Sequence, residues 1–183
     1  MFEDKRSKKL VLVAHCILNQ NSISDGTADF PGAIKKIINL LLQSDIGIIQ
    51  MPCPELLCLG LDRGNINGAE QEVVVENTRI RKLMDQPSAK QKLNLLVKLI
   101  VYQIEEYLLQ GFKIYCIVGI NRSPSCGVDT TSKNNKEVEG KGVFIEALVK
   151  ELEIRGVFID LIGIRASDIK QAKIEIEDQL NNS

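Results

Sequence analysis

Three cysteines occupy positions in the sequence from which they could form one chemical site. The chain of 183 residues contains five cysteines. Cys16 and Cys53 each come shortly after a short apolar run, and Cys126 follows a third run through the polar segment 121–125. Thiolates gathered in one pocket bind zinc or iron–sulfur clusters. These three side chains are therefore candidate ligands of a metal centre.

Cysteines also occur in disulfides and in apolar cores. An odd number of cysteines in a chain without an export signal argues against disulfides. Cysteine often fills apolar cores, but Cys53 lies between two prolines and Cys126 lies in a Ser-Pro-Ser-Cys-Gly turn, neither of which is a core environment. Cys116 lies within an apolar run and is expected in the core. Cys58 is also expected to pack in apolar surroundings. The alternatives are that it is a fourth ligand or a thiol that accepts sulfur.

The number of cysteines bears on the kind of centre. Structural zinc sites commonly use Cys-x-x-Cys pairs, which this sequence lacks. A 4Fe–4S cluster normally has four cysteine ligands. Three would leave one iron with an exchangeable position, much as a catalytic zinc keeps an open site. Such an iron is a Lewis acid with high affinity for sulfur, and it can accept the sulfur of a thiocarbonyl compound.

Alternating strands and helices are expected to position these residues. Apolar runs predict buried strands at 10–14, 46–51, 113–120 and 157–164. Helical periodicity predicts helices from about residue 31, and at 90–109, 142–152 and 167–180. This alternation predicts an α/β, Rossmann-like three-layer sandwich with a mostly parallel sheet of about four strands, as a single domain over residues 1–183. Loops at the carboxyl ends of parallel strands meet at one edge of the sheet, so they can bring the three sulfurs together.

Three polar stretches lack such periodicity. Residues 58–71 are rich in glycine and asparagine and are expected to form a loop. Residues 65–88 and 130–141 are the stretches expected to be mobile or to form a lid over the site.

The composition disfavours several classes of partner. Lys and Arg total 23 against 24 for Asp and Glu, and aromatic residues make up 4% of the chain with no tryptophan. This balance favours neither nucleic acid nor an anionic membrane, and stacking platforms for single strands are few. No segment approaches the length of a membrane span, and the charged start followed by a short apolar run does not form a signal peptide. A cytoplasmic protein is expected, whereas the oligomeric state is not indicated.

Several motifs resemble those of a known family, the 2-thiouracil desulfurases. The similarity runs from the first strand to about Gly127, and it is carried by Cys16 with Asp25-Gly26 downstream, Cys53-Pro54-Glu55, and Ser123-Pro124-Ser125-Cys126-Gly127. The resemblance implies a Rossmann-like domain that binds a 4Fe–4S cluster through three cysteines. It also implies a non-redox reaction in which water replaces the sulfur of a small thiocarbonyl compound, such as a thiolated nucleobase.

The resemblance also suggests roles for individual residues. It implies that Cys16, Cys53 and Cys126 ligate the cluster. Glu55 would accept a proton from the attacking water, with Ser123 as its partner. Asn19, Arg122 and Ser125 are the expected substrate-binding residues, since they lie in the same loops as the ligands.

The sequence departs from the family pattern around the expected substrate pocket. His15 precedes Cys16, Ile17-Leu18-Asn19-Gln20 replaces a glycine-containing turn, and Cys58-Leu59 replaces paired glycines. His15 is the sole histidine. It is a candidate proton donor at the site or a partner of a loop carbonyl. Arg63 is a further candidate for holding an anionic or carbonyl-bearing substrate.

Two other functions fit the same residues. The first is a cluster-bearing carrier or sensor that holds sulfide or a thiolate without turnover. The second is a zinc- or thiol-dependent hydrolase on the same scaffold. Metal analysis separates iron from zinc, and sulfide release separates an enzyme from a carrier.

Overall fold

Four apolar segments pair in parallel to form the central sheet. A computed structural model describes residues 2–182. Within that range the main sheet has the order β2-β1-β3-β6, built from β1 (Lys9–Val13), β2 (Gly47–Gln50), β3 (Lys113–Ile120) and β6 (Asp160–Ile164). All its pairings are parallel. Val11, Leu12 and Val13 of the central strand β1 are fully buried, because helices cover both faces of the sheet.

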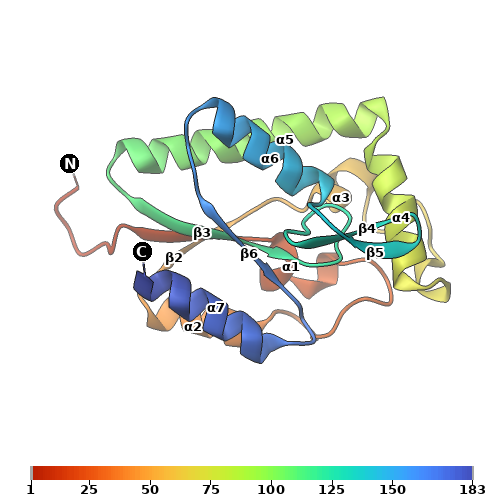
Figure 1. The fold of residues 1–183 in the computed structure, drawn as a ribbon, viewed down its shortest axis with the longest axis horizontal. Helices are drawn as coiled ribbons and strands as arrows, with labels where there is room; N and C mark the ends of the chain where they lie inside the picture. The colour runs from red at the N-terminus through yellow and green to blue at the C-terminus, as the bar shows by residue number, and fades with distance from the viewer. Residues whose placement is uncertain (1, 183) are drawn as a thin grey trace.

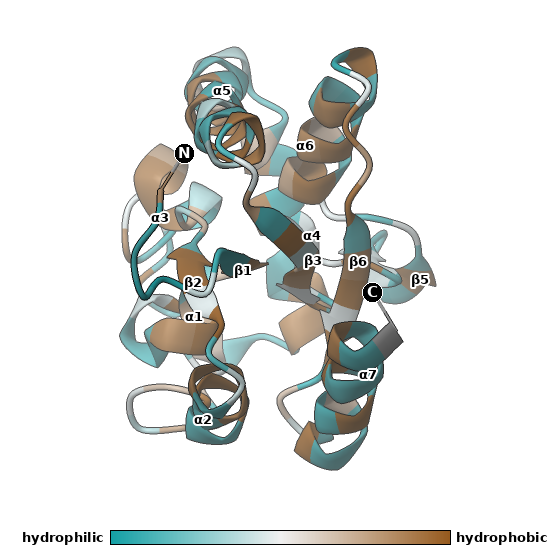
Figure 2. Cartoon of the chain, turned by 90° about the vertical axis from the view of Figure 1, so that its left-hand side faces the viewer, coloured by the Kyte–Doolittle hydropathy of each residue, from teal (hydrophilic) through white to brown (hydrophobic). Residues whose placement is uncertain are grey.

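Two layers of helices enclose this sheet (Figures 1 and 2). α2 (Lys35–Gln43) and α7 (Ile169–Asn182) lie together on one face, and α5 (Pro87–Leu109) and α6 (Val143–Ile154) lie together on the other. Each helix turns an apolar stripe inward, for example Ile37 and Leu41 of α2 and Ile100 and Ile104 of α5. The predicted Rossmann-like three-layer fold is confirmed. No helix within residues 2–182 has the length and apolar character that a membrane crossing needs.

The polar stretches contain regular structure that the sequence pattern does not reveal. α4 (Val73–Met84) occupies half of 65–88, so this stretch contains regular structure that the pattern does not show, whereas a mobile or lid-forming role stays a prediction. Only Ile80 and Met84 of this helix are fully buried apolar residues, whereas Glu76, Asn77 and Thr78 are buried polar ones. This mixture hides the helical periodicity.

The segment 130–141 is likewise regular. β4 (Thr130–Lys133) and β5 (Lys136–Glu139) pair as an antiparallel hairpin, packed beside α4. Asn134 and Asn135 connect them with φ values of 54° and 59°. Two consecutive left-handed residues are typical of a tight hairpin turn, and asparagine tolerates that backbone.

Short helices replace part of the predicted loop at 58–71. α3 (Pro54–Leu59) begins directly after Cys53, and η2 is a short 3-10 helix at Gly68–Glu70. α1 (His15–Leu18) and the 3-10 helix η1 (Gln20–Ser22) follow β1 in the same manner. The loops after β1, β2 and β3 therefore leave the sheet at its carboxyl edge, where the strand order reverses between β1 and β3. In open α/β sheets ligands bind at such a reversal.

Candidate functional site

A cavity at the carboxyl edge of the sheet is lined by all three candidate ligands. Its volume is about 200 Å³, and Cys16, Cys53 and Cys126 line it together with Glu55 and Ser123. Cys126 is buried, and Cys16 and Cys53 are partly buried. Residues remote in the sequence thus share one cavity because each follows one of three neighbouring parallel strands.

Strand register sets the positions of Cys16 and Cys53. Val13 of β1 pairs with Gln50 of β2, and each cysteine lies three residues beyond its strand partner. The Ala14 N–H donates to the Val118 carbonyl, which fastens the start of α1 to β3. Pro52 and Pro54 flank Cys53, which caps α3 by accepting the Leu56 N–H at its Sγ at 3.5 Å. Pro54 at the first helical position suits this turn, since its missing N–H is not needed there.

The Cys126 loop folds back onto the end of β3. The Ile120 N–H donates to the Cys126 carbonyl at 3.0 Å, and the Cys126 N–H donates to the Ser123 Oγ at 2.9 Å. Asn121 organises the outgoing chain, since its Oδ1 accepts from the backbone N–H groups of residues 128, 129 and 130. This loop approaches β3 so closely that a Cβ on Gly119 would lie 2.3 Å from the Cys126 carbonyl oxygen.

We expect Gly119→Ala to destabilise the protein and to displace Cys126. The added methyl meets main-chain atoms that cannot move without shifting the loop, a kind of overpacking that costs about 1–3 kcal/mol. Denaturant unfolding measures this loss. Gly32→Ala is the matched control, because a Cβ at Gly32 meets nothing within 4 Å. Equal stability of the two variants would contradict the close packing of the loop.

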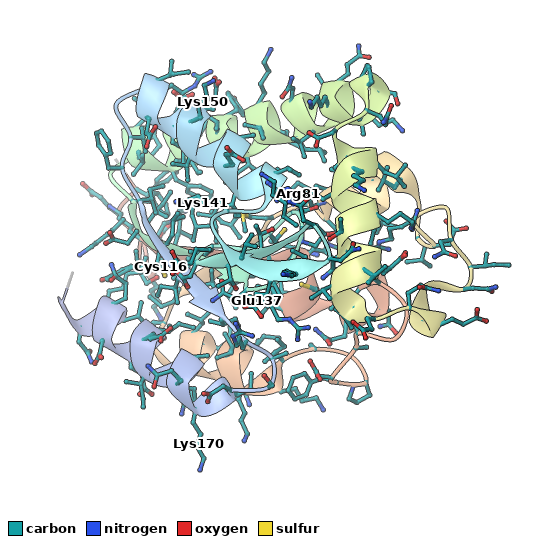
Figure 3. The ribbon with its side chains drawn as sticks, turned by 45° about the vertical axis from the view of Figure 1, so that its right-hand side comes forward. Arg81, Cys116, Glu137, Lys141, Lys150 and Lys170 are labelled. Carbon is teal, nitrogen blue, oxygen red and sulfur yellow. The ribbon has the colours of Figure 1, made fainter. Side chains whose placement is uncertain are left out.

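Side chains from α4 also hold the Cys126 loop. Arg81 donates to the Pro124 carbonyl at 3.2 Å and to the Thr131 Oγ1 at 3.0 Å, and Figure 3 labels it on α4. The Asn77 amide donates to the Arg122 carbonyl at 3.3 Å. Sequence reasoning identified neither residue, because both lie in the polar stretch expected to be mobile or to form a lid. The Asn-x-x-x-Arg spacing, which puts both on one helix face, becomes a signal only once the helix is known.

The three thiols lie in a poorly solvated environment, and charges on neighbouring thiols affect the pKa values of Cys16 and Cys126. Burial raises the pKa of Cys16 to about 12, and the charges of Cys53 and Glu55 add to this rise. Burial likewise raises the pKa of Cys126 well above its ordinary value, followed by the charges of Cys16, Cys53 and Glu55. Burial and Glu55 raise the pKa of Cys53. The three thiols and the Glu55 carboxylate therefore converge on one cavity, and a strongly electron-accepting centre would be needed to hold the sulfurs as thiolates.

The three thiols of the cavity are the donor set available to a metal centre. Within residues 2–182, no group of three or more His, Cys, Asp or Glu side chains is arranged to hold a metal ion. A tetrahedral zinc draws its sulfurs to about 2.3 Å from one point. In a cubane each cysteine binds its own iron, so the three ligands surround a larger body across a cavity. The lining thiols fit that arrangement in number and kind, and ligation by all three stays a prediction.

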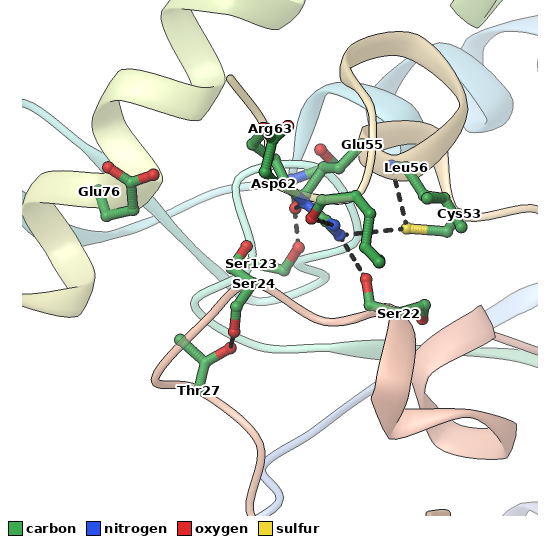
Figure 4. A network of polar contacts seen from close by, with 12 residues as sticks. Ser22, Ser24, Thr27, Cys53, Glu55, Leu56, Asp62, Arg63, Glu76 and Ser123 are labelled. Carbon is green, nitrogen blue, oxygen red and sulfur yellow. Dashed lines mark hydrogen bonds and ion pairs between the residues drawn. The ribbon is translucent and has the colours of Figure 1, made fainter. Parts of the chain in front are cut away.

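Arg63 is a buried cation beside these groups (Figure 4). Its side chain is 2% exposed, and its Nε lies 3.5 Å from the Glu55 carboxylate. It also donates to the carbonyls of Ser22 and Leu61 and lies 3.7 Å from the Cys53 Sγ. The guanidinium therefore fixes the Glu55 carboxylate, closes the loop after α3 and favours a thiolate at Cys53. Arg63 was a candidate for holding the substrate; it lines the cavity, and the structure also gives it these protein partners.

We expect Arg63→Met to be strongly destabilising. Removing the cation leaves the Glu55 carboxylate buried without its counter-charge, and breaking a buried pair in this way costs about 3–5 kcal/mol. Thermal or denaturant unfolding measures the loss. Arg155→Met is the matched control, since Arg155 pairs with Glu105 and Glu151 at the surface, where ion pairs contribute about 0–1 kcal/mol. Similar losses in both variants would show that the buried pair is not a major contributor.

The expected substrate-binding residues separate into two groups. Arg122 lines the cavity and pairs with Glu137 of β5 at 3.5 Å, and Arg165, which also lines the cavity, pairs with the same carboxylate. Burial works against the charge of Glu137, but hydrogen bonds from Thr130 and Arg165 lower its pKa overall. The cavity rim thus carries two guanidinium groups against one carboxylate.

Asn19 and Ser125 do not line the cavity. The Asn19 Oδ1 caps η1 by accepting the Asn21 N–H. Ser125 is fully buried, and its carbonyl accepts the N–H groups of Phe144 and Ile145 at the start of α6. Both residues lie in the expected loops, but their contacts shape the chain behind the site.

The remaining sulfur and imidazole side chains are also placed. Cys116 is fully buried in β3, as predicted. Cys58 lies outside the cavity lining, and its Sγ–H donates to the Ala89 carbonyl at 3.6 Å. His15 lines the cavity. Burial and the Arg63 charge lower the pKa of His15, so its ring is neutral at pH 7.

This chain is similar in sequence to an uncharacterized protein and in structure to a solved enzyme. No protein-family model matches the chain. The uncharacterized protein MJ0003 of Methanocaldococcus jannaschii is 29% identical over 157 residues, which cover 86% of each chain. A solved structure of a 4Fe–4S-dependent thiouracil desulfidase, TudS, aligns with 92% of this chain and 98% of its own, with a TM-score of 0.48 and 14% identity. That likeness is too distant to carry a functional argument, which rests on the residues of the cavity.

Proposed function

We propose that this protein removes sulfur from a small thiocarbonyl compound by a non-redox, iron–sulfur-dependent reaction with water. One observation carries the proposal: three thiols from the loops after β1, β2 and β3 line a single cavity that also holds a carboxylate. The motifs around Cys16, Cys53 and Cys126 resemble those of the 2-thiouracil desulfurases, which supports the same reaction.

Cys16, Cys53 and Cys126 are the residues that would hold a 4Fe–4S cluster. Bound through three thiolates, the cluster supplies an iron with a free coordination position, a Lewis acid suited to thiocarbonyl sulfur. Burial, which raises the pKa values of Cys16 and Cys126, limits the contact of these thiols with water. Exclusion of bulk water strengthens the polarisation of the carbon–sulfur bond.

Glu55 is positioned to act as the base. Its side chain is about 10% exposed, lines the cavity and is held by Arg63. In the proposed reaction Glu55 takes a proton from water as the oxygen attacks the thiocarbonyl carbon. The carbon–sulfur bond breaks, the carbonyl product keeps the water oxygen, and the sulfur leaves as hydrogen sulfide with both protons of the water, one of them returned by Glu55. No electron is gained or lost by the protein.

Ser123 and Arg122 line the side of the cavity formed by the Cys126 loop. The Ser123 Oγ accepts two backbone N–H groups, so its own hydroxyl proton is directed away from them and is available to the reacting water or the substrate. Arg122 and Arg165 offer donors to a carbonyl or anionic group at the rim. A small heterocycle with polar ring substituents fits these groups.

Anaerobic reconstitution followed by activity measurement tests the proposal. The loaded protein is expected to be brown, to contain iron and sulfide, and to release sulfide from 2-thiouracil or 4-thiouridine. Retention of the cluster without turnover on a broad panel of thio compounds would favour a carrier or sensor. Zinc in place of iron in the purified protein would favour a hydrolase.

A further inference from the structure

The imidazole of His15 is held in one protonation pattern. His15 is the sole histidine of the chain and the first residue of α1, next to Cys16. The Gln50 side-chain nitrogen lies 2.5 Å from the His15 Nδ1. An amide nitrogen only donates, so Nδ1 is the acceptor and the neutral ring carries its proton on Nε2.

This Nε2–H group is buried and lacks an acceptor. Among the described residues, no hydrogen-bond partner exists for the His15 Nε2. A buried donor normally has a partner, and an unpaired one at a functional site calls for an explanation. The cost of leaving it unpaired is avoided when a ligand supplies the acceptor.

The position of the ring identifies the kind of acceptor. His15 lines the three-cysteine cavity and also a second cavity, whose other lining residues include Gln50, Cys53, Leu99 and Gln103. His15 and Cys53 therefore both line the two cavities. Glu55, a nearby carboxylate, is engaged by Arg63. Cys53 and the adjacent Cys16 bring sulfur to the part of the cavity that His15 lines, so a sulfur atom is a suitable acceptor for the ring.

We propose that the His15 Nε2–H donates a hydrogen bond to a sulfur of the bound cluster, with Gln50 as the residue that fixes the tautomer. This inference rests on the proposed function, since it requires the cluster. Hydrogen bonds to cluster sulfurs stabilise the more negative, reduced state and thereby raise the reduction potential. His15 thus tunes the centre without ligating it.

The tautomer is tested on the cluster-free protein. Labelling the chain with ¹⁵N-histidine gives one imidazole, so the nitrogen–proton correlations need no assignment. We expect Nε2 to carry the proton and Nδ1 to be unprotonated. Replacing Gln50 with leucine is expected to restore a mixture of tautomers. A proton on Nδ1 in the wild-type protein would overturn the inference.

The hydrogen bond itself is tested on the loaded protein by redox titration and pulsed EPR of the reduced cluster. We expect His15→Phe to lower the midpoint potential, His15→Gln to lower it less because an amide donor remains, and Gln50→Leu to lower it partly. Gln103→Leu, in the same second cavity, is the control and is expected to leave it unchanged. Unchanged potentials in both His15→Phe and Gln50→Leu would overturn the inference.

The ¹⁵N label separates a hydrogen bond from the alternatives. A weak hyperfine coupling to the labelled ring, lost in His15→Phe, supports the proposal. A strong coupling would make His15 an iron ligand, and no coupling would place the ring away from the cluster; either result overturns it. Absence of iron in the reconstituted wild-type protein is the separate failure of the proposed function, whereas a loaded wild type without coupling is the failure of this inference alone.

Discussion

Replacing Cys16, Cys53 or Cys126 with serine is expected to abolish cluster retention in each case. Serine is nearly isosteric but binds iron poorly compared with a thiolate. With two thiols left, the cavity offers too few ligands to hold a cluster during purification. Iron and acid-labile sulfide content, measured after anaerobic reconstitution, checks this expectation, with a loss to background for each single variant.

Cys116 and Cys58 provide matched controls for this experiment. Cys116→Ser places a hydroxyl in the core of β3, which costs stability but leaves the cavity intact. Cys58→Ser keeps a donor near the Ala89 carbonyl outside the cavity lining. Both variants are expected to keep the cluster content of the wild type. A normal cluster in any one of the first three variants would remove that cysteine from the ligand set.

The second large effect is expected at Glu55. Glu55→Gln is expected to keep the cluster and the fold, at a cost in stability because the buried Arg63 loses its counter-charge, and to lower kcat by about 10²–10⁴-fold, the range that general-base catalysis contributes. Glutamine preserves the shape of the side chain, and its carbonyl oxygen still accepts from Arg63. What it loses is the ability to take a proton from water. Initial rates of sulfide release at equal cluster loading measure the effect.

Glu146→Gln is a suitable control for this variant. Glu146 lies on α6, its side chain is 69% exposed, and it does not line the cavity. Its replacement is expected to leave turnover unchanged. Wild-type turnover in Glu55→Gln would exclude this carboxylate as the base, while loss of the cluster in that variant would give Glu55 a structural role instead.

Apolar runs predicted the elements that build the sheet and its helix layers. β1 and β3 are buried on both faces, so nearly every residue of their inner parts is apolar and the pattern is visible without any partner. α4 was missed because Glu76, Asn77 and Thr78 are buried and bond outside the helix, which no periodicity reveals. The β4–β5 hairpin was missed because its residues are mostly polar, although Asn134-Asn135 is a usable turn signal.

The candidate site, like the fold, was predictable from the sequence only in part. Its cysteines were recognisable because each lies just past an apolar strand, and strand topology then decides that they share an edge. The residues that hold the cysteine loops in place were not recognisable in this way. Arg63 reaches Ser22 and Glu55, and Arg81 reaches Pro124, through contacts set by the tertiary fold. Such long-range polar contacts leave no local pattern in the sequence.

The spread of the cysteines along the chain has a consequence for folding. A ligand that binds only the folded state stabilises it in proportion to its affinity and concentration. Here the binding groups belong to segments that come together only after β1, β2 and β3 have paired, so the assembled sheet is the precondition for capture of the inorganic centre. The proposed cluster, once bound, would tie the first strand's exit to a loop more than a hundred residues further along the chain. Loss of iron under oxidative stress would then loosen the carboxyl edge of the sheet first, while the strands and their helix layers stay folded on their own apolar core.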